Sequence, residues 1–127
     1  MKRLASFVAL LCLTSLLHAE ESTVIPASDK AALEEAKGKN VVVEGKIASA
    51  EWSQTGKVMN IEFEGAPHMT GAVFERNRAK LDAAFGGDLA KSLTGATVRL
   101  NGPLSEFRGN LQIIIKTGNQ ITILAPA

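Results

Sequence analysis

Residues 95–124 read GATVRLNGPLSEFRGNLQIIIKTGNQITIL. Apolar side chains recur there at every second position, as Val98 and Leu100 in the first half and Leu111, Ile113 and Ile115 in the second. A period of two is typical of a β-strand that buries one face. The stretch therefore predicts two strands, over 96–102 and 111–116, joined by a polar segment.

The polar segment at 105–110, SEFRGN, holds one aromatic residue, Phe107, directly before an arginine, Arg108. One interpretation is that Phe107, Arg108 and Gly109 only form the turn that leads into the apolar strand, with the Phe107 ring folded back over the core. The other interpretation is that the two side chains belong to a surface that binds a ligand. The sequence leaves both open.

Two further segments show the same alternation. VVVEGKI at 41–47 and KVMNIEFEG at 57–65 place Val41, Val43 and Ile47, and then Met59, Ile61 and Phe63, on one face. Gly45 stands at an inward position of the first segment, which predicts a bulge or a sharp bend there. GAVFER at 71–76 is a third, shorter strand, and ITIL at 121–124 is a last strand that extends the strand at 111–116 or pairs back on it.

Helices are predicted before and between these strands. Ser28 is the expected N-cap of a short helix that ends at Gly38, with the acidic Asp29 in its first turn. A second helix is expected over 77–85, where Leu81 and Phe85 mark one face, and DLAKSL at 88–93 resumes it for a turn or two.

The order of elements predicts the fold class. It is an all-β protein with short helices, namely a five-stranded OB-fold barrel with a helix between strands 3 and 4 and an N-terminal helix. Closing the sheet into a barrel removes exposed strand edges. The structural alternative is a five-stranded roll that does not close.

Three segments also resemble a known family. GKNVVVEGKI at 38–47, TGKVMNIEF at 55–63 and the quoted stretch at 95–124 are similar to bacterial OB-fold nucleic-acid-binding domains. The resemblance covers roughly residues 38–124 and implies an OB-fold with nucleic acid as its ligand. The layout also resembles exported OB-fold proteins of the small periplasmic stress type, for which nucleic acid is not the expected ligand.

The N-terminus reads MKRLASFVALLCLTSLLHAEE, with two cations, an apolar run and a small residue, Ala19, before two glutamates. This is the layout of a secretory signal peptide. The expected organisation is a signal peptide over 1–19, a lead-in and short helix over 20–37, and the OB-fold domain over 38–127. The expected location is secreted or periplasmic.

Processing would also change the charge. The chain has 14 basic and 13 acidic residues, and removing Lys2 and Arg3 leaves 12 basic residues against the same 13 acidic ones. The single cysteine, Cys12, would leave as well. The mature chain would carry a net charge near −1, so overall charge gives no argument for nucleic acid.

The ligand site is expected where OB-folds bind, across strands 2 and 3 and between the loops that join strands 1 to 2 and 4 to 5. The first loop, roughly 49–57, contains Trp52, and the second, roughly 102–110, contains Phe107 and Arg108. These three are the first candidates for contact, and the second candidates are Lys46, Lys57 and Arg76. The alternative interpretation is that Trp52 covers the mouth of the barrel.

The expected partner is single-stranded nucleic acid bound with low sequence preference, because bases stack on aromatic rings and arginine pairs with phosphate. The alternative is a small ligand or an envelope protein, which the glutamates interleaved with the basic residues favour. After processing one histidine remains, His68, in what is expected to be a loop. We therefore expect no enzyme activity, no cofactor and no metal site.

Overall fold

The computed structural model describes residues 23–127, so the predicted signal peptide at 1–19 lies outside the described residues. The strands are β1 (Val24–Pro26), β2 (Asn40–Trp52), β3 (Val58–Phe63), β4 (Ala66–Phe74), β5 (Thr97–Phe107), β6 (Asn110–Ile114) and β7 (Ile121–Ala125). The α-helices are α2 (Lys30–Glu35), α3 (Arg78–Ala84) and α4 (Leu89–Leu93), and the short 3₁₀ turns are η2 (Glu75–Asn77) and η3 (Gly118–Gln120).

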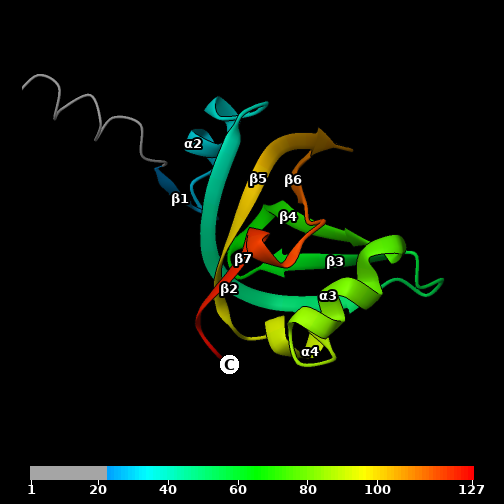
Figure 1. The fold of residues 1–127 in the computed structure, drawn as a ribbon. Helices are drawn as coiled ribbons and strands as arrows, with labels where there is room; N and C mark the ends of the chain where they lie inside the picture. The colour runs from blue at the N-terminus through cyan, green and yellow to red at the C-terminus, as the bar shows by residue number, and fades with distance from the viewer. Residues whose placement is uncertain (1–22) are drawn as a thin grey trace, which may run out of the picture.

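Five of the strands close into a barrel, in which β2 and β5 are the long curved ribbons of Figure 1. The neighbours run β2–β3–β4–β6–β5, and β5 pairs back on β2 from Thr97 to Pro103. All barrel pairs are antiparallel except β4 with β6, and α3 and α4 connect β4 to β5. This is the predicted OB-fold arrangement, and the open roll is excluded.

Two short strands extend the barrel sheet beyond the five. β1 pairs parallel with β2 through Val24 to Pro26, and β7 pairs antiparallel with β5. The expectation that ITIL would pair with the strand at 111–116 was wrong. The turn through η3 carries the chain across to Leu100 and its neighbours in β5, so β7 adds to the fourth barrel strand and not to the fifth.

The core includes the alternating residues that the sequence predicted. The buried positions on the strands are Val41, Val43 and Ile47 of β2, Met59, Ile61 and Phe63 of β3, Val98 and Leu100 of β5, Leu111 and Ile113 of β6, and Ile115 directly after β6. Gly45 has no bulge of its own; the irregularity of β2 lies between Ile47 and Ser49. Instead a Cβ on Gly45 would lie 2.8 Å from Cδ1 of Phe63, so glycine lets this ring pack against the bent strand.

The helices cover the barrel ends. The N-cap of α2 is Asp29, whose side chain accepts a hydrogen bond from the Ala32 N–H at 3.2 Å, and the prediction of Ser28 was wrong by one residue. The apolar face of α2 reduces to Leu33, and α3 and α4 bury Leu81, Leu89 and Leu93. Among residues 23–127, no helix has the length and apolarity that crossing a membrane requires.

Three strands are longer than predicted. β2 runs on to Trp52, where a loop over 49–57 was expected. β4 begins at Ala66, so His68 lies in a strand and not in a loop. β5 continues through Ser105 and Glu106 to Phe107, where a loop was expected. The extension of β4 is held by a strand distant in sequence, because Met69 pairs with Leu111 of β6. The extension of β5 is held by its own hairpin partner, because Glu106 pairs with the same Leu111 from the other side.

Candidate functional site

The outer face of β3, β4 and β6 is hollowed into a groove of about 660 Å³. Its lining residues are Val58, Asn60, Glu62, Thr70, Phe74, Phe107, Arg108, Asn110, Gln112 and Ile114. They alternate with buried core residues along each strand, so the inward side of the same strands fixes the shape of this face. We refer to this set as the groove.

The chemistry of the groove is mixed. Two phenyl rings and two aliphatic side chains lie among one hydroxyl, three carboxamides, one carboxylate (Glu62) and one guanidinium (Arg108). The carboxamides offer both hydrogen-bond donors and acceptors, whereas the two charges cancel. The groove is therefore suited to a ligand with flat apolar faces and polar edges.

Each ring of the groove is accompanied by an arginine. The guanidinium carbon of Arg108 lies 5.1 Å from the centre of the Phe107 ring, and that of Arg76 lies 5.5 Å from the centre of the Phe74 ring. Both distances fall within the range of cation–π attraction. Phe107 is nevertheless 54% exposed, so a large apolar ring stands open to solvent at the rim of the groove.

The turn that carries Arg108 is a two-residue hairpin between Phe107 and Asn110. Both turn residues have positive φ, +53° at Arg108 and +84° at Gly109, which is the geometry of a type I′ turn. Glycine adopts this region freely, but for arginine it costs about 1–2 kcal/mol. Asn or Asp is the usual residue at this position, so an arginine here is unusual and strained.

Trp52 does not line the groove. It pairs across the β2–β3 ladder with Met59, whose side chain is fully buried, so the indole faces the inner side of the sheet. There it packs against the core, and the guanidinium carbon of Arg78 lies 4.4 Å from the ring centre. The structure thus brings Phe107 and Arg108 together at the groove and places Trp52 apart from them, at the barrel end near α3.

The predicted basic residues also separate. Lys57 precedes Val58 in the turn that enters β3, and its carbonyl accepts the Glu75 N–H at 2.9 Å, which places it with Arg76 at the Phe74 end of the groove. Lys46 lies elsewhere, in the bend of β2, with its ammonium 3.8 Å from the Glu64 carboxylate. Lys57 and Arg76 are therefore positioned to act with Arg108 on one ligand, whereas Lys46 is not.

Sequence reasoning missed most of the groove walls. The wall residues that were not predicted as site residues include Asn60, Thr70, Phe74, Asn110 and Gln112. The signal was present for the first of these, because the alternation in VMNIEF already placed Asn60 on the outer face. It was absent for β6, since only the tertiary pairing of β4 with β6 sets Gln112 beside Thr70.

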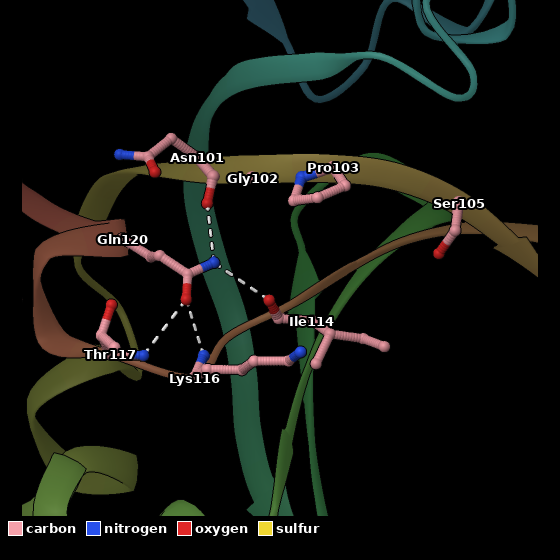
Figure 2. A pocket seen from close by; sticks show the side chains of 8 residues that line it. All are labelled: Asn101, Gly102, Pro103, Ser105, Ile114, Lys116, Thr117 and Gln120. Atoms are coloured by element: carbon pink, nitrogen blue, oxygen red, sulfur yellow. Dashed lines mark hydrogen bonds between the residues drawn. The ribbon is translucent and has the colours of Figure 1, made fainter.

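A second cavity, of about 340 Å³, adjoins the groove at Ile114 (Figure 2). It is organised around the carboxamide of Gln120, which meets backbone groups on both sides. Its Nε2 donates to the carbonyls of Asn101 and Ile114 at 2.9 and 3.0 Å, and its Oε1 accepts from the Lys116 and Thr117 amides at 2.7 and 3.1 Å. This carboxamide therefore joins β5 to the end of β6 where the two strands separate.

Other polar clusters have structural roles. Lys37 donates to Glu106 at 3.1 Å and lies 3.5 Å from Glu34. The hydrogen bond and the charge of Glu106, followed by the charge of Glu34, raise the pKa of Lys37, so it stays charged at neutral pH and ties α2 to β5. Within residues 23–127, no three His, Cys, Asp or Glu side chains gather as metal ligands.

Comparison with known proteins supports the fold only. No family model and no curated protein matches the chain. A protein described as an aspartyl-tRNA synthetase from Leishmania major is similar in structure, with a TM-score of 0.59 at 11% identity over 85% of this chain. The aspartyl-tRNA synthetase of Entamoeba histolytica gives 0.56 at 9% identity over 84%. This chain spans 22% of the length of each synthetase chain.

A smaller protein is also similar in structure. An OBody bound to hen egg-white lysozyme matches with a TM-score of 0.51 at 22% identity, over 73% of this chain and 85% of its own. Identities this low, with TM-scores just above one half, show a shared fold and leave the ligand open. The chain is therefore an OB-fold domain, similar in architecture to parts of two synthetases and to most of an OBody.

Proposed function

We propose that this protein is an exported OB-fold binding module, without catalytic activity, that binds single-stranded nucleic acid with low sequence preference in the groove. The observation that carries the proposal is the exposed Phe107 ring at the groove rim with the guanidinium of Arg108 over it. Stacking of a base on such a ring contributes about 1–3 kcal/mol and tolerates every base. Export is inferred from the signal-like N-terminal sequence.

The rest of the groove fits the same ligand. Phe74 offers a second ring, and the carboxamides of Asn60, Asn110 and Gln112 offer hydrogen bonds to base edges. Arg76 and Arg108 can pair with phosphates through their planar, fork-shaped donors. Two of the structural neighbours are described as tRNA synthetases, which agrees with a nucleic-acid ligand for an OB-fold domain.

Electrostatics set the expected mode of binding. Arg108 lines the groove, and Lys57 and Arg76 lie at its Phe74 end, so these three side chains can neutralise phosphates along it. Three phosphate contacts on a single strand predict a slope of log affinity against log salt of about −2 or shallower. The interaction should therefore depend on stacking more than on counterion release.

A partner protein is the second candidate. The neutral charge balance of the groove and the exposed phenyl ring would also suit a protein surface, and the OBody similar to this chain is bound to lysozyme. The two candidates separate in one experiment: fluorescence anisotropy of labelled oligothymidylate at low salt. An unchanged signal at micromolar protein would contradict nucleic-acid binding. Emission of Trp52 is not a suitable reporter, because the indole lies outside the groove.

Replacing Phe107 with alanine should weaken oligonucleotide binding by about tenfold, because one stacking platform is lost. The free energy of unfolding should change by less than about 0.5 kcal/mol, since the ring is more than half exposed. Leu124→Ala, which also removes an exposed apolar side chain but on β7, is the matched control and should keep full affinity. Unchanged affinity of the Phe107 variant would contradict the role of the ring.

Replacing Arg108 with asparagine should move stability and affinity in opposite directions. Asparagine tolerates the positive φ of this turn position better than arginine, so the free energy of unfolding should rise by up to about 1 kcal/mol. Losing one phosphate contact should lower affinity and make the salt slope shallower by about 0.7. Urea denaturation and anisotropy measure the two effects, and reduced stability with intact binding would show that arginine serves the turn alone.

A further inference from the structure

The carboxylate of Glu62 lies on the outer face of β3 without a partner in the part of the chain that the structure describes. Its cross-strand neighbours are Ser49 on β2 and Thr70 on β4. The Thr70 hydroxyl donates to the Leu111 carbonyl at 3.4 Å, and none of the ion pairs or side-chain hydrogen bonds among residues 23–127 includes Glu62. This contrasts with Glu44, Glu64 and Glu106, which each face a basic side chain.

The position of this carboxylate is central to the ligand face. Glu62 lines the groove and also an adjoining cavity of about 300 Å³ toward Pro67, and Thr70 and Asn110 border both. A single-stranded nucleic acid that lies along the groove from Phe74 past Thr70 must therefore pass over Glu62. Any ligand group that covers it has to compensate for the water that the carboxylate loses.

The sign of the charge decides which part of a nucleic acid can lie there. A phosphate would repel the carboxylate, so a base edge is the group that covers it. An ionised carboxylate has two acceptor oxygens and no donor. Of the bases, guanine alone presents two adjacent donors, N1–H and the N2 amino group, on its pairing edge. Adenine and cytosine present one amino group there, and thymine presents a single N–H between two carbonyl oxygens.

We propose that Glu62 makes the groove prefer a guanine base at one position of an otherwise loosely selected single strand. The inference rests on the proposed nucleic-acid binding and adds the base that the groove selects. Guanine would place N1–H and N2–H on the two oxygens of Glu62, while the Asn110 carboxamide, which borders the same two cavities, offers a donor for O6. A bidentate pair of this kind discriminates between bases by about five- to 150-fold.

The test measures the anisotropy of three short labelled oligothymidylates: one unsubstituted, one with a single central guanine, and one with hypoxanthine in its place. Hypoxanthine keeps N1–H and O6 but lacks the N2 amino group. With the wild-type protein, the guanine oligonucleotide should bind about tenfold more tightly than oligothymidylate, and hypoxanthine should lose most of that gain. One guanine is sufficient, because the strand can slide until that base lies over Glu62, and it is too few to form a quadruplex.

The protein variants assign the effect. Glu62→Gln should bind all three oligonucleotides with similar affinity, because a carboxamide offers only one acceptor. Glu64→Gln, which removes the same charge outside the groove lining, should keep the guanine preference. Equal binding of guanine and thymine strands by the wild type would overturn this inference and leave the proposed function standing. A preference that survives in Glu62→Gln would also overturn it, and absence of binding by every strand at low salt would overturn both.

Discussion

Replacing Leu100 with alanine is expected to lower the free energy of unfolding by about 2–5 kcal/mol. Leu100 is fully buried on β5, where it pairs with Val43 of β2 and with Ile121 of β7. Its Cδ1 lies 3.0 Å from where a Cβ on Gly71 would be, so the Leu100 side chain fills the space beside this glycine. A loss of this size is a large fraction of the roughly 5–15 kcal/mol that stabilises a domain.

Urea denaturation followed by far-UV circular dichroism measures this loss. Leu124→Ala is the matched control, because the same atoms are removed from a side chain that is 43% exposed on β7. Its free energy of unfolding should stay within about 0.5 kcal/mol of the wild type. Equal losses in the two variants would mean that β5 does not lie at the centre of a closed core.

The strands could be predicted because each buries one face and leaves the other in water. That condition imposes a period of two, and the period alone identifies Val41, Met59, Val98 and Leu111 as inward residues. The condition fails where polar or turn-forming residues enter a strand. Pro67 and His68 resemble loop residues, yet β4 already runs through them because its next residue, Met69, pairs with Leu111 more than 40 positions later. Local sequence carries no trace of such a contact.

Trp52 was expected in a loop over 49–57, whereas β2 continues to Trp52 and a register shift within that strand turns the indole inward. Inward positions of β2 are odd-numbered up to Ile47, and continuing that pattern would turn Trp52 outward, toward the groove face. The register shifts between Ile47 and Ser49, however, and beyond it the buried position is Ala50. One extra residue in a strand exchanges its two faces, so every later side chain changes sides. Gly45 indicated an irregularity in this strand, but not where it would fall.

Phe107 and Arg108 both line the groove, and their place there follows from the hairpin that carries them. Arg108 stands in the two-residue turn of the β5–β6 hairpin, and Phe107 is the last residue of β5 directly before it, so both lie at the end of the hairpin, where side chains project into solvent. The walls of the groove could not be found in this way, because Thr70 and Gln112 become neighbours only through the parallel pairing of β4 with β6. The sequence thus predicts the rim of the groove better than its walls.

The largest effect of a single polar change is expected at Gln120. Replacing it with glutamate puts an oxygen where Nε2 now donates to the carbonyls of Asn101 and Ile114 (Figure 2). Two hydrogen bonds are lost, and a carboxylate oxygen is held about 3 Å from two carbonyl oxygens. The site is partly buried, and an acceptor that is left there without a donor costs up to about 1–3 kcal/mol, so the free energy of unfolding should fall by about 1–3 kcal/mol.

Two further variants isolate the cause of that loss. Gln54→Glu introduces the same charge in the exposed turn before β3 and should leave stability within about 0.5 kcal/mol of the wild type. Gln120→Met keeps the length of the side chain but loses all four hydrogen bonds without adding a charge. It should be less destabilising than Gln120→Glu if repulsion from the carbonyls contributes, and urea denaturation at neutral pH ranks the three. A glutamate variant as stable as the wild type would mean that β5 and β6 separate here without needing the carboxamide, so the closure of the barrel would rest on its apolar core alone.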